Sequence, residues 1–502
     1  VAVVKYNPTV MNTNYNKLVT QLQRIADISY SSAVLNWDME TYMPVKGAAR
    51  RAQQLATLSG IVHEQFTSSE TGELLEILSA DQTLDFRQSQ NVKLTLKQYR
   101  KAKKYTREFV EELSRCVSET FTAWQEAKTK NDFSIYAPKL EKLIALKKKE
   151  CELIGYTDHP YDAFLNEYEP ELKTSEVEIL FNDVRKELVP FVKELFSRPT
   201  GSQEILHRNY DKDKQFAFSE TILKQMGYDF EAGRQDISMH PFSTNFCAQD
   251  VRVTTRIDEK NLSDCLTGSI HEGGHALYEQ GIPDDQYGLP SGEYCSLGIH
   301  ESQSRLWENN VGRSMPFWKG QFPELQKTFP EQLKDVSVEQ FYAALNVVKP
   351  SLIRINADEV TYHFHVMIRF EVEKAIFENK LAVNDIPAYW NSRYKEYLGV
   401  DVPSDAEGCM QDVHWSHGSF GYFPTYSLGS FYAAQFFVKA SEEIPNLKSQ
   451  VEQRDYSQLL NWLREKIHRH GKTYSSKELC EKATGEPLNF KYFMEYVKEK
   501  YS

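Results

Sequence analysis

The feature that most constrains the fold of this chain is the pentapeptide His271-Glu272-Gly273-Gly274-His275. Residues four apart share one face of an α-helix, so a helix here brings both imidazoles to a single metal ion. Glu272 is turned by roughly 100° around the helix from His271. It therefore flanks the ion without ligating it, as a general base in a metallopeptidase does. The alternative is a fortuitous surface pattern without a metal.

A third protein ligand is needed, because two histidines leave a catalytic zinc one ligand short. Glu301 lies 26 residues after His275, in a stretch that reads as helix. Two histidines and one glutamate, with a fourth position open, are typical of catalytic zinc sites. The alternative for Glu301 is an ordinary helix carboxylate that pairs with Arg305 one turn later.

The two glycines of the motif lower its helix propensity. Gly273 and Gly274 each disfavour a helix by about 1 kcal/mol relative to alanine. We therefore expect close approach of a substrate or of a neighbouring helix at this point.

Most of the 502 residues read as helix. Leu18, Leu22 and Ile25 stand at helical spacing early in the chain, and an apolar stripe recurs at positions 140, 143 and 144. A chain of this length predicts two or more domains, or one large helical body around a cleft.

Residues 250–256 break this helical pattern. Val251 and Val253 alternate with Arg252 and Thr254, which predicts a strand with one packed face. The edge of such a strand, just before the helix of His271, could hold an extended peptide by main-chain hydrogen bonds. The alternative is a structural hairpin without a ligand.

Composition disfavours several classes of protein. The net charge of −12 repels phosphate backbones, which argues against a nucleic-acid partner. No apolar stretch approaches the roughly 18 residues that a membrane span requires. Residues 1–7 show no secretory signal, and the seven cysteines form no CxxC pair. We therefore expect reduced thiols and a cytoplasmic location.

Several motifs occur together in a specific order. They are residues 37–44 (WDMETYMP), 54–58 (QLATL), 240–242 (HPF), 250–256 (DVRVTTR), 271–275 (HEGGH), 300–305 (HESQSR), 353–359 (IRINADE), 411–415 (QDVHW) and 421–426 (GYFPTY). In these motifs the chain resembles the carboxypeptidase Taq, or M32, family of metallocarboxypeptidases. One departure is Asn356, where the family pattern has an acidic residue; it weakens any charge argument for that turn but touches no expected ligand.

The resemblance implies a mainly α fold: a large helical body around a deep cleft, with a small β-sheet beside the HExxH zinc helix. It implies a single catalytic domain over residues 1–502, with two helical lobes that flank the cleft. The expected activity is removal of single C-terminal residues from peptides with a free C-terminus. One divalent metal ion per chain, zinc or alternatively cobalt, and a homodimer are also implied.

The resemblance also assigns roles to individual residues. His271, His275 and Glu301 are the expected metal ligands, and Glu272 is the general base. His240, His414, Tyr422 and Tyr426 are the candidates for stabilising the oxyanion, although histidines and tyrosines in apolar motifs are as often satisfied core residues.

Arg354 is the family-matched partner for the α-carboxylate of the substrate, because a guanidinium binds carboxylates through two hydrogen bonds. The next segment predicts a helix with a polar stripe on one side and apolar residues on the other, so that both sides face protein or cleft. The polar positions are Asp358, Tyr362, His365 and Arg369, and the apolar ones are Val360, Phe364 and Met367. A buried structural network is the alternative for this stripe.

Two rival functions remain open at this point. A metallo-endopeptidase shares the HExxH motif and Glu301 but needs neither Arg354 nor a closed end to the cleft. A helical scaffold with a degenerate metal site has no use for Glu272, because a purely structural site needs no general base.

Overall fold

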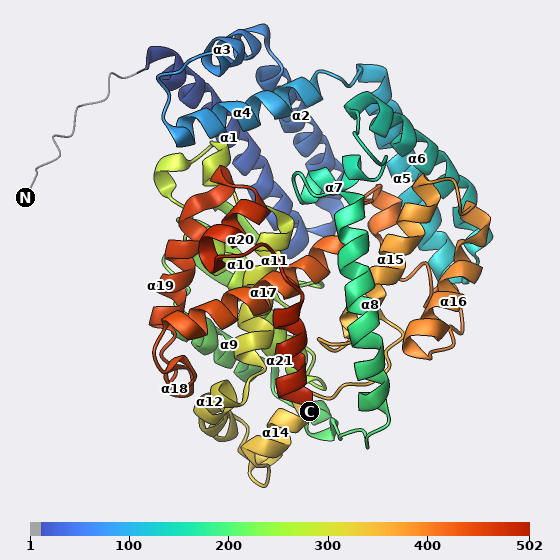
Figure 1. Cartoon of the computed structure of the whole chain (residues 1–502), viewed down its shortest axis with the longest axis vertical. Helices are drawn as coiled ribbons and strands as arrows, with labels where there is room; N and C mark the ends of the chain where they lie inside the picture. The colour runs from blue at the N-terminus through green and yellow to red at the C-terminus, as the bar shows by residue number, and fades with distance from the viewer. Residues whose placement is uncertain (1–11) are drawn as a thin grey trace, which may run out of the picture.

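The computed structural model describes residues 12–502 and consists mainly of helices (Figure 1). The expectation about a secretory signal concerns residues 1–7, which lie outside the described part of the chain. The helices of the first half are α1 (Thr13–Thr41), α2 (Ala48–Phe66), α3 (Ser69–Ser79), α4 (Phe86–Ala102), α5 (Arg107–Lys130), α6 (Phe133–Ile154), α7 (Asp162–Tyr168), α8 (Thr174–Phe196) and α9 (Lys212–Met226).

The second half begins with the helix of the HExxH motif. Its elements are α10 (Leu262–Glu279), α11 (Leu297–Arg305), the π-helix η5 (Leu306–Gly312), α12 (Met315–Thr328), α13 (Pro330–Leu333), α14 (Val338–Leu345), the 3-10 turn η6 (Arg354–Asn356), α15 (Tyr362–Phe377), α16 (Ile386–Leu398), the 3-10 turn η8 (His414–His417), α17 (Pro424–Glu443), α18 (Leu447–Glu452), α19 (Ser457–Lys466), α20 (Ser476–Thr484) and α21 (Lys491–Tyr501).

The predicted amphipathic segments are buried as expected. Asn12 caps α1 by accepting hydrogen bonds from the backbone N–H groups of Asn14 and Tyr15. Leu18 and Leu22 then pack into a small core with α3 and α4. The apolar stripe at positions 140, 143 and 144 is likewise buried on α6. The helical periodicity of the sequence is therefore confirmed at both places.

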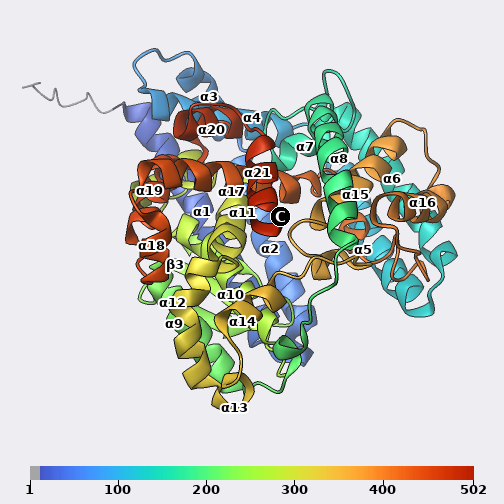
Figure 2. The ribbon, with the colours of Figure 1, turned by 60° about the horizontal axis from the view of Figure 1, so that its bottom comes forward.

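Two large hydrophobic cores organise the rest of the molecule. One contains Trp307 and Trp318 and is built from α9–α12, α14 and α17–α20. The other contains Tyr161 and Trp390 and is built mainly from α6–α8, α15, α16 and α21. Figures 1 and 2 both show α9, α12 and α18 on one side and α5, α6 and α16 on the other. Helix α17 contributes side chains to both cores and so joins them.

A three-stranded sheet lies next to α10. Its strands are β1 (Gly233–Ile237), β2 (Ser243–Cys247) and β3 (Asp250–Thr255), in the order β1-β3-β2. β3 pairs parallel with β1 and antiparallel with β2. Val251 and Val253 are fully buried, which confirms the predicted strand and its packed face.

The prediction that residues 250–256 offer a free edge is wrong. β3 is the central strand, so its main-chain groups are paired on both sides. The edge strands are β1 and β2, and residues Ser243, Thr244 and Asn245 of β2 line the cavity of the HExxH helix. A peptide that adds to this sheet beside that cavity would therefore pair with β2.

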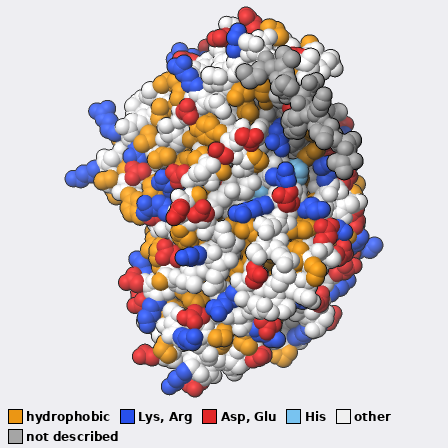
Figure 3. Space-filling view, turned by 90° about the vertical axis from the view of Figure 1, so that its left-hand side faces the viewer, with side chains coloured by type: hydrophobic (Ala, Val, Ile, Leu, Met, Phe, Trp, Pro, Cys, Tyr) orange, Lys and Arg blue, Asp and Glu red, His pale blue; other side chains and the backbone are white. Residues whose placement is uncertain are grey.

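None of the helices in residues 12–502 combines the length and apolarity that a bilayer crossing requires. On the face drawn in Figure 3, acidic and basic side chains are intermixed.

Candidate metal centre and cleft

Three ligand atoms converge between α10 and α11. His271 and His275 come from α10 and Glu301 from α11, and their ligand atoms all lie within 4.8 Å of one another. Oε2 of Glu301 lies 3.7 Å from Nε2 of His271 and 3.4 Å from Nε2 of His275. The HExxH helix and the downstream glutamate thus meet as the spacing predicted.

The glycines of the motif explain why α10 can lie so close to its neighbours. A Cβ atom on Gly274 would stand 2.6 Å from the carbonyl oxygen of Gln303 in α11. A Cβ atom on Gly273 would overlap the side chain of Leu223 in α9. Of the two explanations offered for these glycines, close approach of neighbouring helices accounts for both positions.

Glu301 is also bound by Arg305, through the carboxylate oxygen that does not face the histidines. Its Oε1 accepts a hydrogen bond from Nε of Arg305 at 2.6 Å, while Oε2 faces the two histidines and accepts from Oγ of Ser304 at 3.1 Å. Burial alone raises the pKa of Glu301, but Arg305 and the histidines outweigh it and hold that pKa well below its usual range. The pairing with Arg305 and the placement as a ligand therefore coexist.

Glu308, which the sequence reading missed, orients one of the histidines. Its Oε2 lies 2.9 Å from Nδ1 of His271, and it also accepts from Arg305 at 3.1 Å and Arg313 at 3.2 Å. Because Glu308 is a carboxylate between two arginines, Nδ1 of His271 is the donor and Nε2 keeps its lone pair for a metal. The sequence feature that could have identified Glu308 is its spacing of seven residues from Glu301, because positions seven apart lie on the same face of a helix.

The surroundings of His275 differ from those of His271. Its Nδ1 is buried with no hydrogen-bond partner among residues 12–502. Its ring stacks on His300 with centroids 4.4 Å apart, and Nε2 of His300 lies 2.9 Å from Glu279. Burial lowers the pKa of His275 to about 3, so its imidazole is neutral at neutral pH.

The donor set fits a divalent metal ion. Two imidazole nitrogens and one carboxylate oxygen are the ligands that catalytic zinc sites use. The orientation of His271 by Glu308 and of Glu301 by Arg305 supplies the outer contacts that such ligands need.

Glu272 lines the same cavity as these three residues. The cavity has a volume of about 430 Å³ and is bounded by the β2 edge, α10, α11 and the start of α17. Burial raises the pKa of Glu272 to about 7.

Two tyrosines form another wall of the cavity, and a histidine lies next to one of them. Tyr422 and Tyr426 line the cavity, and the Tyr426 hydroxyl lies 3.3 Å from Nε2 of His414. Burial lowers the pKa of His414 to about 4, so this imidazole is neutral at neutral pH. Two of these three candidates thus line the cavity, and the third, His414, contacts Tyr426.

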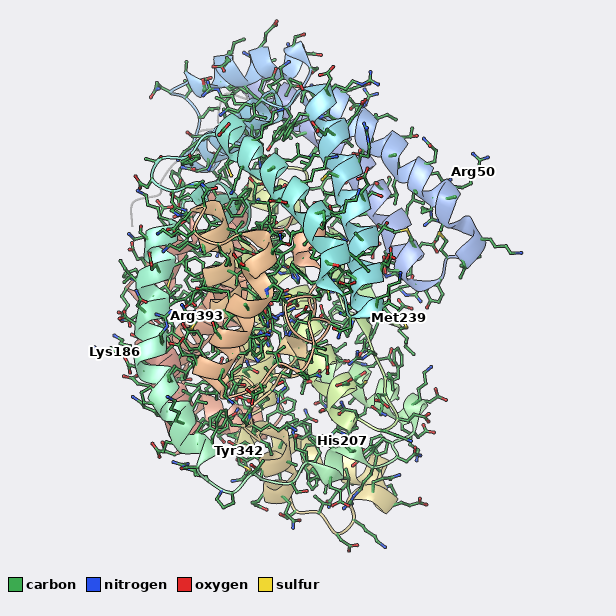
Figure 4. All side chains as sticks on the ribbon, turned by 90° about the vertical axis from the view of Figure 1, so that its right-hand side faces the viewer. Arg50, Lys186, His207, Met239, Tyr342 and Arg393 are labelled. Atoms are coloured by element: carbon green, nitrogen blue, oxygen red, sulfur yellow. The ribbon has the colours of Figure 1, made fainter. Side chains whose placement is uncertain are left out.

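His240 is not part of this wall. It lies in the turn between β1 and β2 with an exposed side chain, whereas its neighbours Pro241 and Phe242 line the cavity. Figure 4 shows the adjacent Met239 at the surface of this turn.

Arg354 lies next to Tyr426 and is bound to the carboxylate of Asp412. Its Nε and Nη2 donate to Oδ1 of Asp412 at 3.0 and 2.8 Å, and its Nη1 donates to the Tyr362 hydroxyl at 2.6 Å. The guanidinium carbon lies 4.9 Å from the ring centroid of Tyr426. The other oxygen of Asp412 accepts from Arg369 at 2.7 Å. Asp412 is a second residue that the sequence reading left without a role, although it stands in the QDVHW motif.

The predicted polar stripe after Arg354 is only partly correct. Asp358 precedes α15 and accepts hydrogen bonds from the backbone N–H groups of Val360 and Thr361 in the turn before the helix. His365 and Arg369 lie on α15 and are fully buried, the former 2.9 Å from the Tyr394 hydroxyl. Both sides of α15 face protein, as predicted, and these two residues form a buried network rather than a cleft wall.

The chain is similar to known carboxypeptidases over nearly its whole length. Residues 17–501 match the model of the family described as carboxypeptidase Taq (M32) metallopeptidase. Carboxypeptidase 1 of Bacillus subtilis (strain 168) is 40% identical, over 96% of this chain and 96% of that protein. Thermostable carboxypeptidase 1 of Thermus thermophilus is 39% identical, over 97% and 98%. The crystal structure of the M32 carboxypeptidase from Deinococcus radiodurans R1 superimposes with a TM-score of 0.96 at 39% identity, covering 98% of this chain and 99% of that one.

Proposed function

This chain belongs to the carboxypeptidase Taq (M32) family of metallopeptidases, and on that premise we propose that it removes single C-terminal residues from peptides with Glu272 as the general base. One observation carries the proposal. Glu272 lines the same cavity as the converging ligand atoms of His271, His275 and Glu301. A base beside a metal-ligand set is what hydrolysis of an amide bond requires.

His271, His275 and Glu301 would hold one divalent ion per chain, for which we propose zinc, with cobalt as the alternative. The bound ion supplies Lewis acidity, which acidifies water and polarises the peptide carbonyl. The Glu272 carboxylate accepts a proton from the attacking water and returns it to the leaving nitrogen.

The wall formed by the two tyrosines supplies hydrogen-bond donors for the oxyanion. Tyr422 and Tyr426 present hydroxyl groups to the cavity, and the neutral His414 imidazole lies next to the Tyr426 hydroxyl. His240 stays a candidate through its motif alone, since its exposed side chain lies outside the cavity.

Arg354 is proposed to bind the α-carboxylate of the substrate. A guanidinium has five N–H donors, and three of those of Arg354 bind Asp412 and Tyr362. The two that remain, one on each terminal nitrogen, have no partner in the described part of the chain. We propose that they bind the two oxygens of the α-carboxylate as a fork. Asp412, shared with Arg369, fixes the plane of that fork.

Further proposals concern the cellular location, the domain organisation and the oligomeric state. The seven free cysteines, all within the described residues, support a reducing, cytoplasmic setting. A single catalytic domain over residues 1–502 and a homodimer follow from the family resemblance.

Mass spectrometry of a peptide ladder tests the activity. The zinc-loaded or cobalt-loaded protein should shorten free-carboxylate peptides one residue at a time, chelation should abolish trimming, and amidated peptides should be poor substrates. Internal cleavage of amidated peptides would establish an endopeptidase instead. A stable metal-free protein with full trimming activity would rule out the metallopeptidase mechanism.

A further inference from the structure

A second cavity, the basic groove, runs between α4 and the region from the end of α6 through α7. It has a volume of about 850 Å³. One wall carries a row of cations from α4 and the turn after it: Lys93, Lys97, Arg100 and Lys101 on the helix, and Lys104 just beyond its end. The spacing of positions 93, 97 and 101 puts them on one helix face. The net charge of the chain is −12, so this row is a locally positive region on an acidic protein.

Three of these lysines have no carboxylate partner among the described residues. Nζ of Lys97 donates to the side-chain oxygen of Asn166 at 3.2 Å, and Nζ of Lys104 donates to the backbone oxygen of Ile154 at 2.5 Å. Both bonds cross the groove to neutral acceptors. Lys93 is exposed and makes no ion pair there. Uncompensated positive charge therefore faces the groove.

The other two cations are paired at the surface. Arg100 binds Glu76 at 2.9 Å, and Lys101 binds Glu167. Exposed pairs of this kind contribute little to stability, so both cations can exchange partners with an anionic ligand. Of the two lining carboxylates, Asp162 is occupied by the backbone N–H of Thr174 at 2.7 Å, which leaves Glu171.

The groove adjoins the candidate active site through a middle cavity of about 420 Å³. Tyr294 and Leu297 line both the metal cavity and the middle cavity. Ile154 lines both the middle cavity and the basic groove.

We infer that the middle cavity and the basic groove bind the part of a peptide upstream of the trimmed residue, and that the enzyme favours peptides with acidic residues in that part. The inference rests on the proposed function. A peptide whose C-terminal residue lies in the metal cavity has to leave it through an adjoining space, and the middle cavity, which shares Tyr294 and Leu297 with it, is such a space. Lysines without carboxylate partners then offer an acidic stretch the complementary charge.

A nucleic acid is a poorer occupant of the groove. Single strands bind where aromatic rings stack on successive bases along a basic track. Tyr156 is the single aromatic residue in the groove lining. The overall acidic charge also opposes a phosphate backbone.

Matched peptides test the inference. Two long peptides share one C-terminal sequence and differ only in an upstream run that is all Glu in one and all Gln in the other. For the metal-loaded enzyme, the Glu peptide should have a kcat/KM on the order of tenfold higher at low ionic strength, and the gap should close at high salt. In Lys93→Glu/Lys97→Glu the preference should reverse, and in Lys93→Gln/Lys97→Gln it should shrink. A tetrapeptide with the same C-terminus should be trimmed equally by all of these proteins.

Lys319→Glu/Lys334→Glu is the control, because it makes the same change of charge at exposed positions on α12 and after α13. It should keep the preference of the wild type. Equal rates for both peptides in the wild type, or a preference that survives Lys93→Glu/Lys97→Glu, would overturn the inference.

Direct binding separates failure of the groove from failure of the proposed function. If neither peptide is trimmed, the proposed function fails, and fluorescence anisotropy of the labelled Glu peptide still decides the groove. Weaker binding to Lys93→Glu/Lys97→Glu than to the control supports the groove, and equal binding overturns it. Tighter binding of a single-stranded oligonucleotide than of the Glu peptide would also overturn the peptide assignment.

Discussion

Glu308 accepts a hydrogen bond from Nδ1 of His271 at 2.9 Å, from a π-helix that follows directly on the helix of Glu301. Residues 301–308 therefore supply both a candidate metal ligand and the group that orients another. Arg305, which contacts both carboxylates, couples the two functions.

Removal of the charge on Glu308 should weaken metal binding. Glu308→Gln can no longer fix the Nδ1–H tautomer of His271 as strongly, so metal affinity should fall by about 10- to 100-fold, measured by competition with a chelating dye. Glu279→Gln is the matched control, because Glu279 makes a contact of the same length to Nε2 of His300, which is not a proposed ligand. Unchanged affinity in Glu308→Gln would show that the contact does not orient the ligand.

Glu272→Gln should keep the metal but lose turnover. The amide preserves size and hydrogen bonding but is no base, so kcat should fall by about 10² or more while metal content stays at one ion per chain. His271→Ala and Glu301→Ala should instead lower the metal content itself. Near-normal turnover in Glu272→Gln would assign the general base to another group.

Arg354→Ala should separate exopeptidase from endopeptidase activity. Loss of a buried partner for the α-carboxylate should lower kcat/KM on free-carboxylate peptides by about 10²- to 10³-fold and leave metal content unchanged. Arg354→Lys should restore activity only in part, because an ammonium cannot form the fork. The rate gap between free and amidated peptides should shrink in Arg354→Ala. Normal trimming by this variant would exclude Arg354 as the carboxylate partner.

The buried His363 predicts a loss of stability in acid. Its Nδ1 lies 3.0 Å from the Ser427 hydroxyl, and burial lowers its pKa to about 3. Between pH 6.5 and 3 the unfolded chain binds a proton here that the folded chain does not, so stability falls as the pH falls through this window. His363→Asn, which keeps a partner for Ser427, should lose less unfolding free energy than the wild type between pH 7 and pH 5, by up to about 2 kcal/mol. Urea unfolding at both pH values measures the difference. Equal losses in both proteins would show that His363 is not the group responsible.

The sequence by itself determined the features that depend on local spacing. Helical periodicity identified the buried stripe of Leu18 and Leu22, and the four-residue spacing of His271 and His275 put both imidazoles on one face of α10. These predictions succeeded because an α-helix fixes the relation between residues a few positions apart. Motif order identified the family, which the comparisons then showed.

Only the tertiary structure decided which groups from distant segments meet. Alternation predicted the β3 strand, but the pairing of β1 and β2 on either side of it made β3 the central strand and left the two edges to β1 and β2. The choice of Asp412 as the partner of Arg354 joins segments 58 residues apart. The contact between His271 and Glu308 spans 37 residues. No periodicity encodes such contacts, because they depend on how whole helices pack. In this packing, Gly273 and Gly274 set how closely α10 approaches α9 and α11.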